Sequence, residues 1–173
     1  GMAAIQDHRY QEAFKHLQPL AEQNYPRALF ALGQLCASGK GTYRDETRAI
    51  DYYRRAAERN HTEAQYTLGT MYADGRGVEK NPATAAEWYR RAAEAGLPEA
   101  AMSLGRYHEN GREESDKEQA IEWYHRAAVS FKKANRPEDA EAALVSMENL
   151  ADRSPAVLGI VAKLRETLVL AKK

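Results

Sequence analysis

Small and apolar residues recur along the chain at intervals of three or four positions, and glycine or asparagine separates the runs. The clearest two runs lie within residues 62–97. The first has these residues on one face: Ala64, Leu68, Met71 and Tyr72. The second has a similar face: Ala85, Ala86, Tyr89, Ala92 and Ala93. Because this spacing follows a period of 3.6 and does not alternate, it predicts a pair of helices over 62–74 and 82–95.

The same pair of patterns occurs three times, 36 residues apart. Gly33, Gly69 and Gly105 occupy one position of the first pattern. Tyr53, Tyr89 and Tyr124 occupy one position of the second, and the last interval there is 35 because a loop residue is missing. A fixed period of this length is the sequence signature of a helical repeat array.

The two ends of the chain differ from the complete copies. Residues 8–23 repeat only the second pattern. In the third copy, the place of Asn60 and Gly96 falls on Phe131, so we expect that helix to continue to about residue 133 or 134 and to end at Asn135. Two further helix patterns follow at 137–151 and 155–172. The sequence therefore predicts an array over 8–134 and a C-terminal helical cap over 135–173, with a half repeat at 8–24 and repeats at about 25–60, 61–96 and 97–134.

The recurring glycines and asparagines predict local geometry. A glycine in the middle of a helix costs about 1 kcal/mol relative to alanine, so we expect Gly33, Gly69 and Gly105 to pack against an aromatic side chain such as Trp88. The residues expected to end helices in the left-handed conformation are Asn24, Asn60, Gly96, Gly39, Gly75 and Gly111.

Helix starts carry their own signals. Thr62-x-x-Gln65 and Ser115-x-x-Glu118 fit the capping-box pattern. Prolines precede or open several of the predicted helices: Pro26, Pro82, Pro98 and Pro155.

Charge and composition narrow the function classes. The chain has 25 Lys plus Arg and 25 Asp plus Glu, a net charge of zero, so it lacks the overall attraction to phosphate of most nucleic-acid binders. The basic positions on the second helices follow acids at i−4, as in Asp51 and Arg55 or Glu122 and Arg126, which predicts a neutralised outer face. We therefore expect no nucleic-acid partner. The sequence also has no apolar run long enough for a membrane span.

The first residues contain no apolar segment of signal-peptide length. We expect a cytoplasmic protein if Met2 is the native start, and a periplasmic or secreted one if a signal peptide has been removed.

No residue pattern predicts catalysis or a cofactor. Cys36 is the single cysteine and lies on an apolar helix face, which favours core packing. The five histidines form no metal-binding spacing; His16 and His61 are expected at the surface and His108 in packing. Gly75-Arg76-Gly77 follows a helix, which is the wrong context for a phosphate loop. We expect no catalytic residues, no metal and no cofactor, hence a protein that is not an enzyme.

These residues resemble the Sel1-like repeat family, a relative of the tetratricopeptide repeat. The match is densest over residues 64–96, at Ala64, Tyr66, Leu68, Gly69, Tyr72, Gly75, Gly77, Val78, Trp88, Tyr89, Ala92, Ala93 and Gly96. The resemblance implies an all-α fold, a right-handed α-α superhelix of the Sel1-like or tetratricopeptide type, here with a C-terminal capping helix pair. It also implies an adaptor that holds a protein or peptide partner.

By analogy with related repeats, the first helix of each pair lines a concave, partner-binding side. One face of each first helix is not part of the apolar pattern, and its residues differ between copies. The candidate residues are Arg27, Gln34, Glu63, Thr67, Thr70, Asp74, Glu99, Ser103, Arg106 and Asn110, with Ala31 and Ser38 on the same face. A plain solvent-facing stripe would also vary between copies.

A second candidate surface lies on the last helix, where Leu158, Val169 and Leu170 widen the apolar face. Surplus apolar residues there indicate either a partner, including a second copy of the chain, or deeper burial against the array. The favoured function is a non-enzymatic adaptor that binds a protein or peptide on the concave face. The alternative is an assembly module that acts through its terminal helices.

Overall fold

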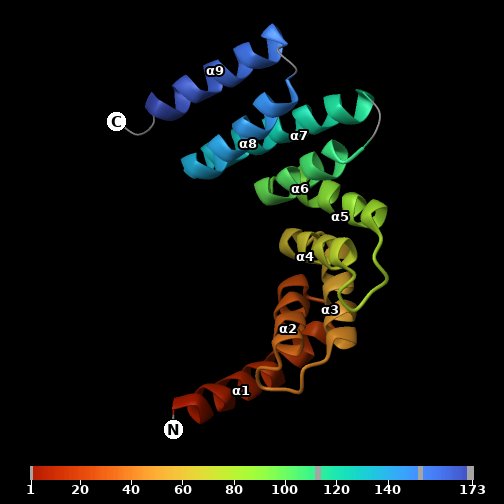
Figure 1. Ribbon diagram of the computed structural model, residues 1–173. Coiled ribbons are helices and arrows are strands. Elements are labelled where there is room, and N and C mark those ends of the chain that lie inside the picture. The colour runs from red at the N-terminus through yellow and green to blue at the C-terminus, as the bar shows by residue number, and fades with distance from the viewer. Residues whose placement is uncertain (1, 112–113, 152–153, 171–173) are drawn as a thin grey trace. The chain divides into compact units, whose positions relative to one another are not determined.

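The computed structural model describes residues 2–111, 114–151 and 154–170; side chains are described from residue 9 onward, except those of residues 114, 169 and 170. These residues form nine helices and no strand (Figure 1). The helices are α1 (Met2–Glu22), α2 (Pro26–Ser38), α3 (Glu46–Glu58), α4 (Thr62–Asp74), α5 (Pro82–Glu94), α6 (Pro98–Glu109), α7 (Glu114–Lys133), α8 (Pro137–Leu150) and α9 (Pro155–Leu170). The chain divides into two compact units, residues 1–91 and 92–173.

Each unit is built by packing successive helices. In the first unit, α1 contacts α2, α2 contacts α3, and α3 contacts α4. In the second unit, α6 contacts α7, α7 contacts α8, and α8 contacts α9. A helix that contacts chiefly its neighbours in sequence is the defining feature of a solenoid, so the prediction of an all-α helical repeat array is confirmed.

The repeated small and apolar positions form the core. Leu32, Leu68 and Leu104 are completely buried, and so is Cys36, as its place on an apolar face predicts. Burial raises the pKa of the Cys36 thiol, which keeps it protonated and unreactive at neutral pH.

The mid-helix glycines pack against tyrosine and not against tryptophan. A Cβ atom at Gly33 would lie 2.6 Å from Tyr53 Cε1, and one at Gly69 would lie 2.7 Å from Tyr89 Cδ1. At Gly105 it would overlap the ring of Tyr124. The expectation of a close aromatic contact is therefore confirmed, but Trp88 is the wrong residue: the tyrosine one position later points into the pair.

Most predicted helix ends are confirmed. Asn24, Asn60 and Asn135 adopt φ values of 59°, 60° and 56°, and α7 continues to Lys133 as the third copy predicts. The half repeat is longer than expected, since α1 begins at Met2. Gly111 is wrong as a left-handed residue, because α6 ends with Asn110 at a φ of −83°.

Both capping boxes are wrong. α4 is capped by His61, whose Nδ1 accepts a hydrogen bond from the backbone N–H of Ala64. Gln65 is buried, and its side chain donates to the carbonyl of Ala57 at 3.1 Å instead of reaching back to the helix start. Ser115 lies inside α7, one residue after its first residue, Glu114.

Among the described helices, none is both long enough and apolar enough to cross a membrane. The described residues likewise contain no group of three His, Cys, Asp or Glu side chains arranged to hold a metal ion.

Candidate functional site

The helices alternate between two roles. We call α2, α4 and α6 the A helices, since each opens a repeat, and α1, α3, α5 and α7 the B helices. The predicted binding residues lie on A helices, except Asn110, which caps the C-terminal end of α6, and each is at least partly exposed. The first unit holds those of α2 and α4, and the second unit holds those of α6. We call them the A-helix stripes: Arg27, Gln34, Glu63, Thr67, Thr70, Asp74, Glu99, Ser103, Arg106 and Asn110.

The short polar side chains of the stripes bond to their own helices. Thr67 donates to the carbonyl of Glu63 at 2.7 Å, and Ser103 donates to that of Glu99 at 3.0 Å. The amide of Asn110 donates to the carbonyl of Arg106 at 2.7 Å. Because the two hydroxyls have already used their single donor within the helix, they can offer a partner only acceptor capacity, whereas Asn110 keeps one N–H and its amide oxygen.

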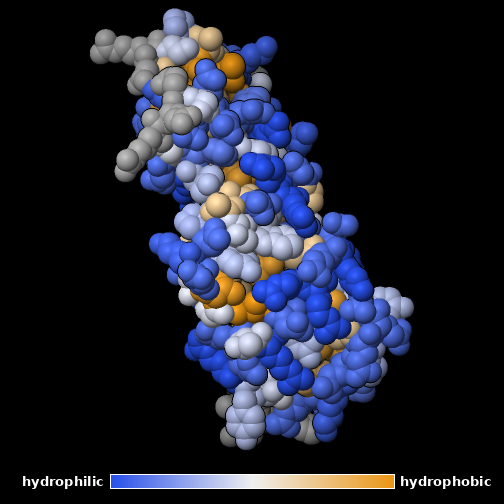
Figure 2. Space-filling view, turned by 90° about the vertical axis from the view of Figure 1, so that its right-hand side faces the viewer, coloured by the Kyte–Doolittle hydropathy of each residue, from blue (hydrophilic) through white to orange (hydrophobic). Residues whose placement is uncertain are grey.

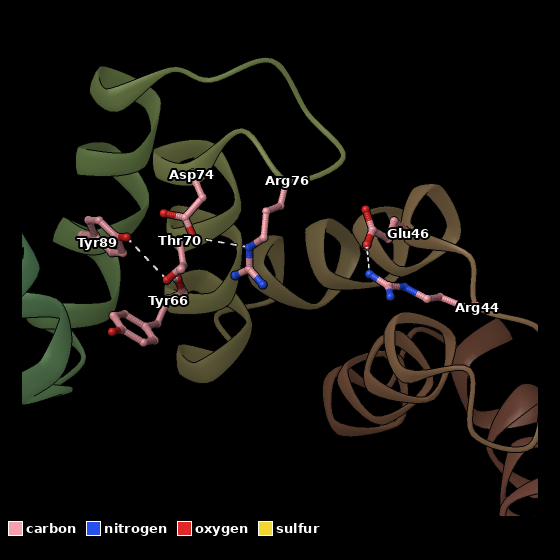
Figure 3. Close-up of polar contacts among 7 residues, drawn as sticks. All are labelled: Arg44, Glu46, Tyr66, Thr70, Asp74, Arg76 and Tyr89. Carbon is pink, nitrogen blue, oxygen red and sulfur yellow. Dashed lines mark hydrogen bonds and ion pairs between the residues drawn. The ribbon is translucent and has the colours of Figure 1, made fainter.

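Thr70 is the most constrained of the stripe residues (Figure 3). Its hydroxyl donates to the Tyr66 carbonyl at 3.0 Å and accepts from the Tyr89 hydroxyl at 3.4 Å. The rings of Tyr66 and Tyr89 lie 5.6 Å apart at a tilt of 41°. Thr70 therefore ties α4 to α5 in the first unit, which is a packing role more than a binding one.

Asp74 lies at the C-terminal end of the α4 stripe and is the last residue of the helix. Its carboxylate lies 3.3 Å from Arg76 Nε, and both side chains are more than half exposed (Figure 3). An ion pair that exposed contributes little to stability. Asp74 and Arg76 therefore present two opposite charges to solvent beside each other.

The N-terminal end of the α4 stripe is built from an aromatic stack. The ring of His61 stacks on Phe30 of α2 with centroids 4.7 Å apart. The expectation that His61 lies at the surface is therefore wrong: its side chain is largely buried, and burial lowers its pKa. His61 Nδ1 also lies 3.3 Å from the carboxylate of Glu63, so the neutral ring caps α4 and the protonated ring pairs with Glu63.

On α2, two stripe residues project without a partner among the described residues. Arg27 and Gln34 are exposed, and neither side chain has a hydrogen bond or an ion pair there. Arg27 is nevertheless close enough to His61 to help lower its pKa. The stripe in the first unit thus combines an unpaired cation and an amide on α2 with two carboxylates on α4.

The stripe on α6 has a different character. Glu99 is bonded to Arg136, the residue that precedes α8, and Arg136 also bonds Asp139 at 2.6 Å. One oxygen of the Glu99 carboxylate is buried without a hydrogen-bond partner. Arg106, by contrast, is exposed and its side chain pairs with none of the described residues. In the second unit, Arg106 is therefore the stripe residue most open to a partner.

The B helices carry arginines that pair with acidic residues four positions earlier. Arg55 lies 3.7 Å from Asp51 and Arg126 lies 2.5 Å from Glu122, as the i,i+4 spacing predicts. The Arg126 guanidinium also lies 4.6 Å from the Trp123 ring centroid. Figure 2 shows one face of the molecule, on which hydrophilic residues predominate.

The predicted surface on the last helix is only partly described. Leu158 is half-buried, whereas Val169 and Leu170 have side chains outside the described residues. Among the described residues, the large apolar side chains that are exposed in this part of the chain are instead Ile160 on α9 and Val145 on α8. Ile160 belongs by spacing to the core face of α9, so its exposure was not visible in the sequence pattern.

Comparison with known proteins gives one family. The sequence matches the Sel1 repeat over residues 4–25, 26–61, 62–97 and 98–128. A comparison with curated proteins gives no match.

Among the solved structures that resemble the chain are two with Sel1-type folds. One is a Sel1 repeat protein from Oxalobacter formigenes, with a TM-score of 0.72 and 30% identity, covering 84% of this chain and 57% of its own. The other is c5321, described as a protective antigen present in uropathogenic Escherichia coli strains and displaying an SLR fold, with a TM-score of 0.62 and 29% identity. That match covers 80% of this chain and 33% of c5321. The chain thus spans 57% of the length of the first structure and 33% of that of the second.

Proposed function

This chain belongs to the Sel1-repeat family, and we propose that it is a non-enzymatic adaptor that binds a protein or peptide through its A-helix stripes. Sel1 repeats generally mediate protein–protein interaction, and the family is typically a non-enzymatic scaffold. We propose that the stripes belong to a repeat array that ends at about residue 134 and that the helices after it act as a cap.

One observation carries the proposal. At the repeated A-helix positions an alanine, a leucine and a glycine recur in the core, whereas the set of exposed residues changes from copy to copy. Arg27, Glu63 and Glu99 occupy one such position, and Gln34, Thr70 and Arg106 occupy another. Each A helix therefore offers a different contact to a ligand that runs across it, which is how a repeat array reads an extended segment.

The side chains suggest the chemistry of the partner. The α2 and α4 stripe presents Arg27 and Gln34 on one helix and Glu63 and Asp74 on the other. An extended peptide or loop with both acidic and basic residues complements it, whereas a uniformly acidic segment meets two like charges, Glu63 and Asp74, and a uniformly basic one meets Arg27. In the second unit, Arg106 by itself favours an acidic group of a partner.

A charge-exchange variant tests the proposal. Arg27→Glu combined with Asp74→Lys keeps the net charge and alters two exposed side chains, so helicity and melting should stay unchanged. Partners captured from the source cell by the natural chain should be lost from this variant. The matched control is Arg90→Glu combined with Glu87→Lys, which makes the same exchange at exposed positions of the B helix α5.

Quantitative mass spectrometry of the captured proteins reads the result. Loss of the same partner from the test variant and from the control variant would mean that net surface properties, not the A-helix stripe, decide binding. Equal capture by all three proteins would reject the stripe as the binding surface.

A second candidate function is assembly through the terminal helices. The exposed Ile160 and Val145 favour it, since both lie in the last two helices. We expect an Ile160→Asp variant to be less self-associated than the natural chain if this is correct. Sedimentation that shows the natural chain to be a monomer at every concentration would argue against it.

A further inference from the structure

The last turns of the first three B helices share one backbone contact. Ala21 of α1, Ala57 of α3 and Ala93 of α5 occupy the same repeat position. The carbonyl of each accepts the backbone N–H of the residue three positions later, at 2.9, 3.0 and 2.9 Å. Because a carbonyl oxygen has two lone pairs, each of these helix ends can accept a second hydrogen bond.

In the first unit, a side chain of the chain itself donates that second hydrogen bond at both helix ends. The guanidinium of Arg55 donates to the Ala21 carbonyl at 2.9 Å and to the side-chain oxygen of Asn24 at 3.0 Å. The side-chain amide of Gln65 donates to the Ala57 carbonyl at 3.1 Å. The ends of α1 and α3 are therefore both completed by an internal donor.

The end of α5, which lies in the second unit, has neither donor. The position of Gln65 is taken by Ala101, and no side chain among the described residues donates to the Ala93 carbonyl. The position of Asn24 is taken by Gly96, and nothing lies within 4 Å of the place of its Cβ atom. One acceptor position at this helix end is therefore open within the described part of the chain.

Arg126 is the equivalent of Arg55, and two contacts keep it beside its own helix. Its guanidinium lies 2.5 Å from Glu122 and 4.6 Å from the centroid of the Trp123 ring. In the first copy the aromatic residue is Tyr52, whose ring centroid is 5.9 Å from the Arg55 guanidinium. Because tryptophan attracts cations more strongly than tyrosine does, the exchange of Tyr52 for Trp123 favours this withdrawn position of Arg126.

A hollow of about 380 Å³ lies beside the open end of α5. Residues of the last turn of α5 and of α7 line it: Ala93, Glu94, His125, Arg126, Val129 and Ser130. Within the described residues, the side chains of Glu94, His125 and Ser130 have no hydrogen bond or ion pair. The hollow therefore offers several polar groups that the chain does not use.

The charges around the hollow favour a cation. Glu122 balances Arg126, so the carboxylate of Glu94 is the charge without an opposite partner among the lining residues. The C-terminal end of a helix adds partial negative charge, which also favours a cation.

We propose that this hollow binds the guanidinium group of an arginine side chain from a partner protein. The group takes the place that Arg55 occupies at the end of α1, donates to the open Ala93 carbonyl and pairs with Glu94. A guanidinium has five N–H donors in a fixed fork, so it can serve two acceptors at once, as Arg55 does. The apolar side chains of Ala93 and Val129 then contact the stem of the bound arginine.

This site lies on B helices, apart from the A-helix stripes, so it can hold or fail independently of the proposed adaptor function. The first test titrates the full chain with acetyl-arginine-methylamide, which carries the side chain of a protein arginine and no charged termini. We expect the NMR signal of the Ala93 carbonyl carbon to shift and to saturate, because a new donor reaches that oxygen. The carbonyl carbons of Ala21 and Ala57 are internal controls and should stay in place, since Arg55 and Gln65 already donate to them.

Three further probes test the chemistry of the ligand. Acetyl-citrulline-methylamide has nearly the same shape without the charge, and an equal response to it would overturn the assignment of a cation. Binding of free arginine without binding of the blocked form would overturn the choice of a protein side chain. A response of His125 and Ser130 to inorganic phosphate, without a response of Ala93 to blocked arginine, would show an anion site in its place.

Glu94→Gln tests the carboxylate. We expect it to weaken binding of the blocked arginine by about two- to fivefold, the change that an exposed ion pair gives. Glu58→Gln is the matched control, because it makes the same substitution at the equivalent exposed position of α3, where Gln65 already donates to Ala57. Binding should be unchanged in this control. An equal loss in both variants would mean that net charge alone attracts the probe, and would refute the site.

Discussion

The second and third repeats share the same core contacts but differ in how their first helices begin and end. In α4 with α5, and in α6 with α7, a buried leucine and a glycine–tyrosine contact recur at the same positions: Leu68, Gly69 and Tyr89, and then Leu104, Gly105 and Tyr124. The helix ends differ. α4 is capped by His61 and ends in a left-handed glycine, whereas α6 follows Leu97 and ends at Asn110 in the right-handed region.

The difference shows where the chain tolerates change. Packing inside a helix pair requires shape complementarity to a few tenths of an ångström, so it is repeated. Helix ends and exposed faces can be satisfied by several residue types, so they vary and are available for a partner. Substitutions at equivalent positions of the two repeats can test this division, and the expected effects fall in the order given below.

The largest effect is expected in the shared core. Leu68→Ala and Leu104→Ala should each lower the free energy of unfolding by about 2–5 kcal/mol, because both side chains are fully buried and leave a cavity. Urea unfolding followed by circular dichroism measures both. Tyr43→Ala is the control, since that side chain is 93% exposed and its loss should change little. Clearly unequal costs at the two leucines would mean that the two cores are not equivalent.

The glycine–tyrosine contact should give the next largest effect. Gly69→Ala and Gly105→Ala each insert a methyl group against a tyrosine ring, and we expect a loss of about 1–3 kcal/mol. Gly159→Ala on α9 is the matched control, because nothing lies within 4 Å of the position of its Cβ. That substitution should stabilise the chain by about 1 kcal/mol through helix propensity alone. Stabilisation at all three positions would show that the tyrosines move aside.

These contacts also mark the limit of sequence reasoning. The period of 36 predicts which positions are buried and which asparagines end helices, because those depend on local backbone geometry. It does not distinguish Trp88 from Tyr89 as the neighbour of Gly69, since adjacent residues of a helix differ only by a rotation of its face. The position of the tyrosine follows from how the two helices cross.

The candidate site was predictable in outline only. The A-helix stripe residues are all at least partly exposed, as their spacing suggests. The Glu99–Arg136 bond joins residues 37 positions apart, and the His61–Phe30 stack joins α4 to α2. Neither has a local sequence signal. Both contacts change what a stripe residue can offer a partner. Glu99 is already paired with Arg136, and Glu63 lies beside the His61 ring, which can titrate.

Alanine substitutions at the C-terminal ends of α4 and α6 should lower stability by different amounts. Gly75 has a φ of +74°, and Gly75→Ala should cost about 1–2 kcal/mol because a side chain disfavours that conformation. Asn110 has ordinary helical geometry, so Asn110→Ala removes only its exposed bond to Arg106 and should cost about 0.5–1 kcal/mol. Thermal melts of the two variants give the order, and the reverse order would mean that the backbone strain at Gly75 is relieved locally.

The smallest expected effect is on the pH dependence of stability. We expect it from the residue that precedes α4 and not from the residue that precedes α6. Burial lowers the pKa of His61, so the unfolded chain takes up a proton at this residue at a higher pH than the folded chain does. The contribution of neutral His61 is therefore complete above the unfolded pKa of about 6.5, and it is lost as pH falls through the folded value. The pair with Glu63 opposes this loss, and the nearby Arg27 reinforces it.

His61→Asn tests this assignment, because asparagine can also cap a helix but does not titrate. We expect the melting temperature of the natural chain to fall more steeply than that of the variant between pH 7 and pH 5, although the variant loses the stack on Phe30 and melts lower at pH 7. Leu97→Asn, at the equivalent position before α6, should leave the pH dependence of the natural chain unchanged. If His61→Asn also leaves it unchanged, the cap of α4 does not depend on the charge of His61, and the ends of the two A helices differ in geometry but not in their response to acid.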